Sequence, residues 1–302
     1  MREPVVTVVG SVNRDLVLTV EELPRPGETV LARGFVEGVG GKGANQAVAA
    51  ARLGSRVRLI ARVGADAEAV LRSLAAEGVD VGAVRTAPES ATGIASVVVD
   101  RAGENTIVVN PGANAELSVA DLPRRLVRSA GEVVLVQHEI AAEVVAATVL
   151  RAREQGAVVV LNPAPARPPA PEVLAAVDVL VPNLGELATL LGAQPPVGPA
   201  GARELLARAA LPCRAVVVTL GADGALVVRP DAPAVHLPAP AVEAVDTVGA
   251  GDTFCGALAD SLARGADLLA AAERAVRAAS LAVTGLGAQC AMPTAAQLDA
   301  AP

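Results

Sequence analysis

EAVDTVGAGDTFCGALADSLARG, residues 243–265, joins a turn of small residues to a strongly patterned helix. The apolar residues of one helix face recur at i, i+4 and i+8: Phe254, Leu258 and Leu262. The glycine–alanine–glycine turn at 249–251 leaves the first N–H groups of the helix open to an anion. Asp252 lies in the first turn, where a carboxylate can take a proton from a group that attacks a bound phosphate. Taken alone, the segment favours a simpler interpretation, an acid that stabilises a helix start.

The second informative stretch is GVGGKGANQAV, residues 38–48, which contains the only lysine among the 25 lysines and arginines of the chain, Lys42. An ammonium is a compact point charge that fits where a planar guanidinium does not, although a solvated loop lysine is the alternative. The stretch also matches the dinucleotide-binding pattern G-x-G-x-x-G, at Gly38, Gly40 and Gly43. That fingerprint should directly follow the first strand, near Gly10. We therefore interpret the match as accidental.

The composition argues against several classes of protein. Apolar residues make up 52% of the chain and aromatic residues 1%, so we expect a core of small aliphatic side chains. The formal charge is −7 and the arginines are scattered, which argues against a nucleic-acid partner. No uncharged apolar run reaches about 18 residues, and the first apolar stretch is too short for a signal peptide. We expect a soluble, cytoplasmic protein with no membrane partner. Three cysteines without C-x-x-C spacing predict reduced thiols: Cys213, Cys255 and Cys290.

Apolar runs alternate with amphipathic segments along nearly the whole chain. Buried strands are predicted at 5–10, 57–63, 133–137, 158–162, 179–182 and 215–220, and helices at 44–52, 67–77, 141–155, 200–210, 252–264 and 268–283. This alternation predicts one α/β domain over residues 1–302, with a mostly parallel central sheet covered by helices on both faces. Proline-rich segments at 164–171 and 194–199 are interpreted as surface loops.

Two regions depart from this alternation. Residues 16–20 with 28–38, and 93–100 with 105–110, are typical of short extended pairs joined by turn residues. Hairpins do not belong in a parallel sheet, so we expect a separate small β-layer formed by about 13–38 and 92–110. A layer above the carboxyl ends of the parallel strands would act as a lid that excludes water from phosphoryl transfer.

Seven segments together resemble the ribokinase/PfkB-type family of sugar kinases: GSVNRDLVLTVEELPRPGETV (10–30), GGKGANQAVAAARLG (40–54), LNPAPA (161–166), VPNLGE (181–186), VTLGADG (218–224), VDTVGAGDTFCGAL (245–258) and GAQCAMP (287–293). The resemblance covers residues 5 to 295 and implies a three-layer α/β/α sandwich with a β-sheet lid. It also implies ATP-dependent phosphorylation of a sugar hydroxyl. The segments SVNRD, PRPGET and NPAPA are most similar to members that convert D-ribose and ATP to ribose 5-phosphate and ADP. A kinase for 2-deoxyribose, fructose or a nucleoside is the alternative.

The resemblance also implies roles for individual residues. Asp252 is the general base, and the backbone of Gly249, Ala250 and Gly251 forms the anion hole. The sugar pocket is lined by Asn13, Asp15, Gly41, Lys42, Asn45 and Glu139. Read locally, the N-x-D at 13–15 also fits turn chemistry, and Glu139 also fits an acid at a helix start.

For the nucleotide, the resemblance implies Asn183, Thr219, Gly221, Gly224, Gly251 and Val276, although the turn at 219–224 is ordinary in isolation. The N-x-x-E of Asn183 and Glu186 would organise Mg²⁺, a hard cation that prefers oxygen ligands. A potassium site is implied at Asp246, Val248, Ala282, Gly285, Gly287 and Ala291. Gly285 and Ala291 depart from the commonest family pattern, but most ligands would be carbonyls. We therefore expect K⁺ as a monovalent activator.

The family further implies a homodimer through the β-layer, since a thin sheet with one apolar face needs cover. Two other classes of function stay open from the sequence. A non-catalytic sugar or nucleotide sensor on the same fold should carry a damaged Asp252 or GAGD turn, and both are intact. A nicotinamide-dependent oxidoreductase rests only on the glycine pattern at 38–43.

Overall fold

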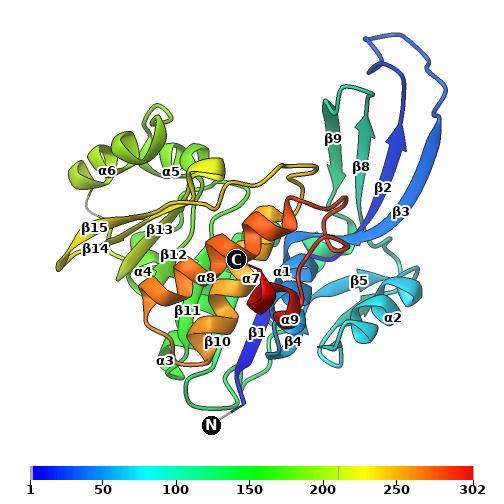
Figure 1. Cartoon of the computed structure of the whole chain (residues 1–302). Coiled ribbons are helices and arrows are strands. Elements are labelled where there is room, and N and C mark those ends of the chain that lie inside the picture. The colour runs from blue at the N-terminus through cyan, green and yellow to red at the C-terminus, as the bar shows by residue number, and fades with distance from the viewer. Residues whose placement is uncertain (1–2, 210, 302) are drawn as a thin grey trace.

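The computed structural model describes residues 3–209 and 211–301. Within these residues the central sheet has nine strands (Figure 1). Their order is β15 (Ala232–Leu237), β14 (Ala225–Arg229), β13 (Ala215–Thr219), β12 (Val179–Leu180), β11 (Val158–Asn162), β10 (Val133–Gln137), β1 (Val5–Val9), β4 (Arg56–Ile60) and β6 (Val79–Asp80). Neighbours from β13 to β6 are parallel. The strands β14 and β15 are antiparallel to their neighbours and end the sheet.

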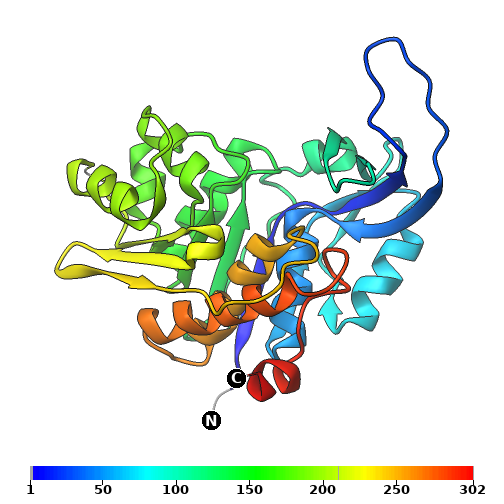
Figure 2. The same ribbon diagram turned by 45° about the horizontal axis from the view of Figure 1, so that its top comes forward.

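Helices cover both faces of the sheet, so the domain has three layers (Figures 1 and 2). One layer contains α1 (Lys42–Arg52), α2 (Glu68–Ala76), α7 (Ala250–Ala263), α8 (Leu268–Ala282) and α9 (Ala295–Ala300). The other contains α3 (Ala142–Glu154), α4 (Pro171–Ala175), α5 (Leu184–Leu191) and α6 (Gly198–Arg208). Alternate strand residues face opposite layers: Val133 and Leu135 of β10 join one core, and Val134 and Val136 the other. The predicted α/β sandwich with a mostly parallel sheet is confirmed.

Several elements differ from the sequence-based expectation. The hairpin of β14 and β15 was not predicted, because its apolar residues are interrupted by Arg229, Pro230 and Asp231. The helix α5 was also missed. The proline-rich segments that were interpreted as loops end in helices, since Pro171 begins α4 and Pro199 lies in the first turn of α6. The expected helix at 200–210 ends at Arg208 in the structure, and its last expected residue, Ala210, lies outside the described residues.

A separate four-stranded sheet rises from the carboxyl edge of the main sheet (Figure 1). Its strands are β3 (Gly34–Gly40), β2 (Asn13–Thr19), β8 (Gly93–Val99) and β9 (Asn105–Asn110), in that order. Both predicted hairpins are antiparallel as expected, and a parallel pairing of β2 with β8 joins them. Two shorter strands, β5 (Arg62–Gly64) and β7 (Arg85–Ala87), pair below it, and the 3-10 helix η1 (Gly112–Glu116) follows β9.

The strand order reverses beside β1. The chain first adds β4 and β6 on one side of β1 and then crosses to β10 and β11 on the other side. Ligands of open parallel sheets bind outside the carboxyl ends at such a reversal, because the connections leave in opposite directions and open a crevice. Residues 10–12 after β1 and residues 138–139 after β10 therefore mark the predicted location of a site.

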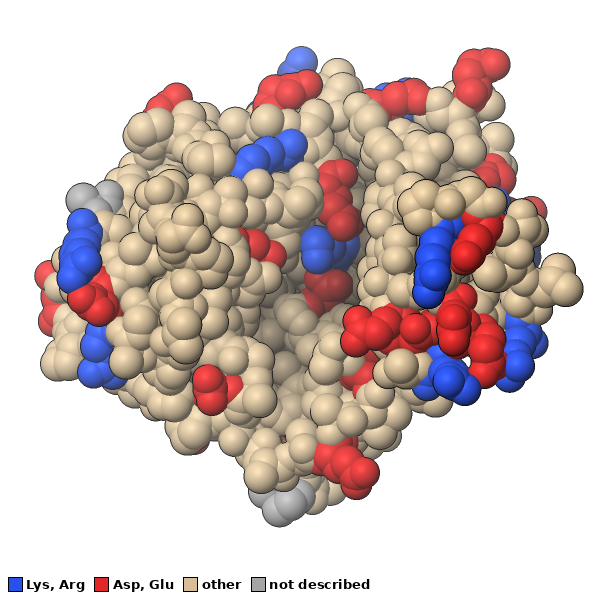
Figure 3. Space-filling model, turned by 90° about the horizontal axis from the view of Figure 1, so that it is seen from above, with Lys and Arg blue, Asp and Glu red and all other residues tan. Residues whose placement is uncertain are grey.

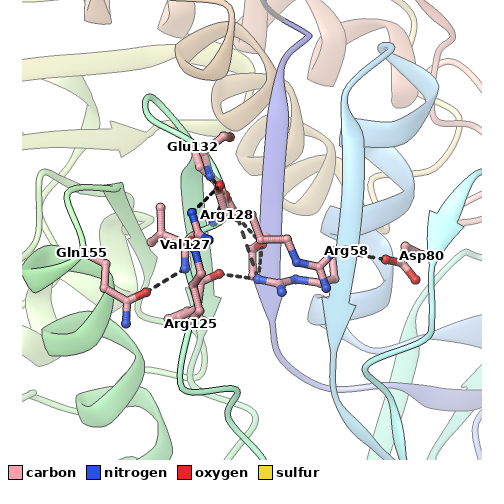
Figure 4. A network of polar contacts seen from close by, with 10 residues as sticks. Arg58, Asp80, Arg125, Val127, Arg128, Glu132 and Gln155 are labelled. Carbon is pink, nitrogen blue, oxygen red and sulfur yellow. Dashed lines mark hydrogen bonds and ion pairs between the residues drawn. The ribbon is translucent and has the colours of Figure 1, made fainter.

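A buried polar network lies at the other end of these strands (Figure 4). Arg58 of β4 donates to the hydroxyl of Thr7 at 3.0 Å and to the carbonyl of Leu126, and it lies 3.9 Å from Glu132. The hydroxyl of Thr7 donates to Glu132 at 2.6 Å. These contacts anchor the loop before β10 to the two central strands.

Within the described residues, none of the helices has the length and apolar character that crossing a membrane requires.

Candidate active site

The helix α7 presents Asp252 at the crevice. Gly249 is the N-cap residue and Ala250 the first helical residue, so Asp252 is the third residue of the helix. Its side chain is buried, with 8% of the residue exposed. The N–H of Ala250 is spent on the carbonyl of Thr247, at 3.3 Å. Within the described residues, the N–H groups of Gly251 and Asp252 have no hydrogen-bond partner. Of the backbone groups expected to form the anion hole, Ala250 therefore has its N–H engaged, and the helix amides of Gly251 and Asp252 remain for an anion.

Two amide side chains of α1 hold the carboxylate of Asp252. Asn45 donates to Oδ2 at 3.0 Å, and Gln46 donates to Oδ1 at 2.9 Å. This pairing needs a close approach of α1 and α7, and Gly256 permits it. A Cβ on Gly256 would lie 2.5 Å from the Cβ of Ala49. Both carboxylate oxygens thus have a fixed donor, while the acid stays at the mouth of the anion site.

The turn before α1 depends on Gly41. Its φ of 85° lies in the left-handed region, and a Cβ there would come within 2.9 Å of the backbone nitrogen of Asn13. The turn aims the start of α1 at the crevice, so Lys42 begins the helix there. Of the three glycines in the G-x-G-x-x-G match, Gly38 and Gly40 lie on β3 and Gly43 lies in the first turn of α1. The match therefore does not follow β1, as a dinucleotide-binding fingerprint should.

Glu139 closes the crevice from the β10 side. Its Oε2 accepts from the hydroxyl of Ser11 at 2.5 Å and from the backbone N–H of Lys42 at 3.0 Å. Ser11 also accepts from the N–H of Gly43, at 3.3 Å. The acid therefore links the loop after β1, the loop after β10 and the first turn of α1, where the helix dipole favours its charge.

Asp15 and Asn13 lie on β2, at the base of the small sheet. Burial, with the negative charges of Glu139 and Asp252, raises the pKa of Asp15 to about 6. Its Oδ1 is buried and has no hydrogen-bond partner among the described residues. Asn13 accepts at Oδ1 from Asn114 of η1, at 2.8 Å. A buried acceptor that lacks a donor is costly in an empty pocket, and hydroxyls of a ligand would satisfy it.

Lys42 faces three carboxylates. Burial alone would lower the pKa of Lys42, but the charges of Asp252, Glu139 and Glu186 more than offset it and raise this pKa above its ordinary value. Burial also raises the pKa of Glu186, and the positive charge of Lys42 partly opposes this shift. Figure 3 looks down on this face of the molecule, where basic and acidic side chains gather in a hollow. The ammonium is therefore a fixed positive charge in an otherwise acidic crevice.

Two cavities meet the crevice. One, of about 480 Å³, is lined by Asn13, Lys42 and Glu139, among others. The other, of about 660 Å³, includes Ala250 and Gly251, the two residues before Asp252, in its lining. All six residues expected at the nucleotide line this larger cavity: Asn183, Thr219, Gly221, Gly224, Gly251 and Val276. The nucleotide residues expected from the sequence thus line one cavity, and Asn13, Lys42 and Glu139 of the expected sugar residues line the other.

The N-x-x-E motif has a structural task that the sequence analysis did not recognise. Asn183 is the N-cap of α5: its Oδ1 accepts from the N–H of Glu186, and the Glu186 carboxylate accepts from the N–H of Asn183, both at 2.8 Å. This is a capping box, and its spacing is readable in sequence as a helix start. The same box orients Glu186 toward Lys42, so the structural and the predicted metal role are compatible.

Asp246 ties together the two loops of the predicted potassium site. Its two oxygens accept from the N–H groups of Val248 and Gly287, each at 2.9 Å. Ala282 and Val283 spend their carbonyls on N–H groups of the same loops, and Gly285 lies against Ala291. The expected residues are therefore neighbours. Within the described residues, no cluster of three or more His, Cys, Asp or Glu side chains is arranged to hold a metal ion.

Sequence reasoning missed the polar residues that support the site. These are Ser11, Gln46, Asn114, Gln137, Asn162 and Gln289. Gln289 donates to Oδ1 of Asn45 at 3.0 Å, which fixes the amide that faces Asp252. A partial signal was present, since Gln46 stands inside GGKGANQ and Gln137 ends a buried strand, where a polar side chain needs a partner.

Comparisons with known proteins agree with this geometry. The profile of the pfkB family of carbohydrate kinases matches residues 4–295. A ribokinase of Bacillus subtilis (strain 168) is 39% identical over 302 aligned residues, which cover 97% of this chain and 98% of that protein. A deoxyribokinase of Salmonella typhi is 37% identical, with 97% of each chain covered. The solved structure of Arabidopsis thaliana ribokinase complexed with ribose and ATP is similar with a TM-score of 0.88 and 33% identity, over 98% of each chain.

These similarities extend over the whole fold. They confirm the ribokinase-like architecture, with its large mixed sheet and a small separate sheet. The GAGD turn, the single lysine and the cavity residues lie within the matched range. The chain therefore belongs to the pfkB family of carbohydrate kinases.

Proposed function

We propose that the protein phosphorylates D-ribose at its 5-hydroxyl with ATP, to give ribose 5-phosphate and ADP. The observation that carries the proposal is the position of Asp252: both of its oxygens are held by amide donors, and its neighbour Gly251 lines the larger cavity. An acid fixed in this way beside two unpartnered helix amides suits transfer of a phosphoryl group from one cavity to the other. The similarity to ribokinases of other organisms supports ribose as the sugar.

The sugar would bind between the small sheet and α1. Asp15 offers a buried oxygen without a donor, and a sugar hydroxyl can donate to it. The side chains of Asn13 and Glu139 line the smaller cavity and would bind further hydroxyls. Such acceptors give selectivity, because a sugar that lacks the matching hydroxyl leaves them buried and unpaired. The backbone of Gly41 and the amide of Asn45 complete this side of the pocket.

In the transfer step, Asp252 accepts the proton of the attacking 5-hydroxyl, which increases the nucleophilicity of that oxygen. The amides of Gly251 and Asp252 donate to the phosphate oxygens as charge shifts onto them. Lys42 supplies the positive charge between sugar and phosphate. The small sheet, acting as a lid over the crevice, would exclude water that competes as an acceptor of the phosphoryl group.

Mg²⁺ is expected with the nucleotide, and it would neutralise phosphate charge. The residues fit such an ion: Glu186 faces Lys42 and Asp252, and its capping-box bond to Asn183 leaves further lone pairs for metal-bound water. One carboxylate is sufficient, because Mg²⁺ retains most of its waters and takes its other ligands from phosphate.

K⁺ is expected at the paired loops. Asp246 fits this role, since each of its oxygens accepts one N–H and keeps a lone pair for a cation. Backbone carbonyls of Val248 and of the loop at 284–291 would supply the other ligands. Because these loops adjoin the start of α7, a bound cation would stabilise the turn that presents the helix amides.

The enzyme is proposed to act as a homodimer through the small sheet. Apolar side chains lie exposed on its outer strands: Phe35, Val36, Ile107, Val108 and Val109, each with 51% to 65% of the residue exposed. The strand register places Val36, Ile107 and Val109 on one face and Phe35 and Val108 on the other. Burial of one of these faces against a second copy would remove exposed apolar side chains from water.

The test is ADP release from Mg·ATP with D-ribose, 2-deoxyribose, fructose and adenosine offered separately, each with and without K⁺. Preference for ribose supports the proposal, and stimulation by K⁺ supports the cation site. The second candidate is 2-deoxyribose, which the similarity to a deoxyribokinase favours. Turnover of 2-deoxyribose in preference to ribose would refute the assignment of the sugar, and release of ADP with none of the four would refute the activity.

Asp252→Asn should lower kcat by about 10²- to 10⁴-fold, because the amide cannot accept the proton, while the affinity for ribose changes little. The measurement is kcat with ribose and the Kd of ribose by calorimetry. Asp267→Asn is the matched control, since Asp267 is an exposed N-cap of α8 and asparagine caps equally well. Near-normal kcat in Asp252→Asn contradicts the base assignment.

A further inference from the structure

We propose that Gln137 is a positioning residue for the reaction, because it sets the orientation of the Gln46 amide and so keeps a hydrogen-bond donor on Asp252. The proposal rests on the proposed function, in which Asp252 is the general base. Neither glutamine is expected to touch the sugar or the nucleotide, and neither lines the two cavities of the crevice.

The contacts form a chain of side-chain amides behind the acid. Gln137, the last residue of β10, donates from Nε2 to Oε1 of Gln46 at 2.6 Å. Gln46 then donates from Nε2 to Oδ1 of Asp252 at 2.9 Å and to Oδ1 of Asn162 at 3.1 Å. Asn162 in turn donates to the carbonyl of Val181 at 2.9 Å. The chain crosses from β10 and β11 to α1 and ends on the base.

The orientation of Gln46 is decided by what faces each end of its amide. Its nitrogen faces two oxygens and its oxygen faces one nitrogen, so a rotation by half a turn would place oxygen against oxygen and nitrogen against nitrogen. Both Gln46 and Gln137 are fully buried, with 0% exposed. Water cannot supply a substitute donor at such a place, so the N–H of Gln137 is the contact that identifies the oxygen end of Gln46.

Gln137 is itself held by packing. A Cβ on Gly10 would lie only 2.0 Å from Oε1 of Gln137, so the side chain fills the space that the glycine leaves after β1. The same oxygen has no hydrogen-bond partner among the described residues. A buried oxygen without a donor destabilises the fold. The same orientation of the Gln137 amide, however, points its nitrogen at Gln46 and so supplies the donor to Gln46.

A base whose two oxygens are both anchored keeps one orientation toward the attacking hydroxyl. Asn45 anchors Oδ2 and Gln46 anchors Oδ1. Loss of either donor lets the carboxylate rotate and weakens alignment, which transfer reactions penalise strongly. Gln137 thus acts on the reaction through Gln46, at two hydrogen bonds from the base.

The experiment compares Gln137→Glu and Gln137→Met with wild type, by kcat for ribose from pH 5.5 to 9. In Gln137→Glu the buried carboxyl is protonated at low pH, donates to Oε1 of Gln46 and preserves the chain. As the pH rises it ionises and only accepts, so the Gln46 amide reverses and turns its oxygen to Asp252. We expect the ratio of its kcat to that of wild type to fall by about ten- to a hundredfold across this range.

Gln137→Met removes the donor without adding a charge, so its kcat ratio should be reduced and independent of pH. In both variants the KM for ATP should stay at the wild-type value, because the nucleotide cavity does not include these residues. The matched control is Gln155→Glu. The side chain of Gln155 accepts from the N–H of Val127, as Figure 4 shows, and donates to the carbonyl of Arg124. It does not line either cavity of the crevice, so the kcat ratio of Gln155→Glu should stay at one.

A kcat ratio for Gln137→Glu that stays constant with pH, or equals that of wild type, would overturn the proposal. If Gln137→Glu does not fold, Gln137→Met is combined with Gln46→Met. Loss of the Gln137→Met effect in that background supports action through Gln46, and additive effects refute it. Failure of the proposed function is distinguishable, since it appears as absence of sugar-dependent ADP release in the wild-type enzyme or as normal turnover in Asp252→Asn.

Discussion

Binding of ribose should release a proton from Asp15 near pH 6. The pKa of this carboxyl is raised to about 6 by burial and by the charges of Glu139 and Asp252. In the free enzyme about half of Asp15 is then protonated at pH 6 and about one part in a hundred at pH 8. Sugar hydroxyls that donate to the carboxylate favour its ionised form. We therefore expect release of about 0.5 proton for each ribose bound at pH 6 and almost none at pH 8.

The assay is isothermal titration calorimetry of ribose in two buffers that differ in ionisation enthalpy. The dependence of the observed enthalpy on the buffer gives the number of protons released. Asp15→Asn should abolish the release at pH 6. Asp66→Asn is the matched control, because hydrogen bonds from Thr92 and Arg14 outweigh burial and hold the pKa of Asp66 at about 2, so this acid stays ionised throughout.

The same ionisation should appear in catalysis and in stability. Below pH 6, kcat/KM for ribose should fall about tenfold for each pH unit, because the ionised form of Asp15, which accepts from the sugar hydroxyls, becomes scarce. The folded chain binds the proton of Asp15 more tightly than the unfolded chain does, because the pKa of Asp15 is raised in the fold. Protonation of Asp15 therefore adds to the free energy of unfolding below about pH 4, and this stabilisation is lost as the pH rises through about 6. Ribose binding without proton release at pH 6 would refute the role of Asp15.

Two further predictions concern packing and assembly. Gly256→Ala places a methyl group 2.5 Å from the Cβ of Ala49, so it should lower the free energy of unfolding by about 1–3 kcal/mol and reduce kcat. Chemical denaturation measures the free energy of unfolding, and Gly38→Ala is the control, because its added Cβ meets nothing within 4 Å. An unchanged stability of Gly256→Ala would contradict the close packing of α1 and α7. Phe35→Asp should shift the sedimenting species from dimer to monomer, because it puts a charge among the exposed apolar side chains of the small sheet. A wild-type protein that sediments as a monomer would refute the dimer.

Local patterns predicted most of the elements because their causes lie within a few residues. Alternating valine-rich runs and amphipathic helices follow from side-chain periodicity, and each pattern repeats within its own segment. The segments that were missed or misinterpreted carry local patterns that fit more than one structure. The N-x-x-E at 183–186 was interpreted only as a nucleotide motif, although the same spacing is a capping box for α5. The hairpin of β14 and β15 was hidden by polar residues at its turn.

The candidate site divides in the same way. Asp252, Lys42 and the glycine turns were identified from motifs, since each is encoded in a short stretch. The hydrogen bonds to Asp252 were not, because the one from Gln46 joins residues that are 206 positions apart. The raised pKa of Asp15 likewise comes from burial and from the charges of Glu139 and Asp252, which lie far away in sequence.

The sequence by itself therefore determined the fold class and most of the elements, and it named the candidate residues, because periodicity and short motifs record local chemistry. Only the tertiary structure decided which amides of α7 stay open, how Gln137, Gln46 and Asn45 orient the base, and which acid binds a proton near neutral pH. Hydrogen-bond partners, burial and the field of neighbouring charges depend on distances in space, and these exist only once the two helix layers and the small sheet have packed around the crevice.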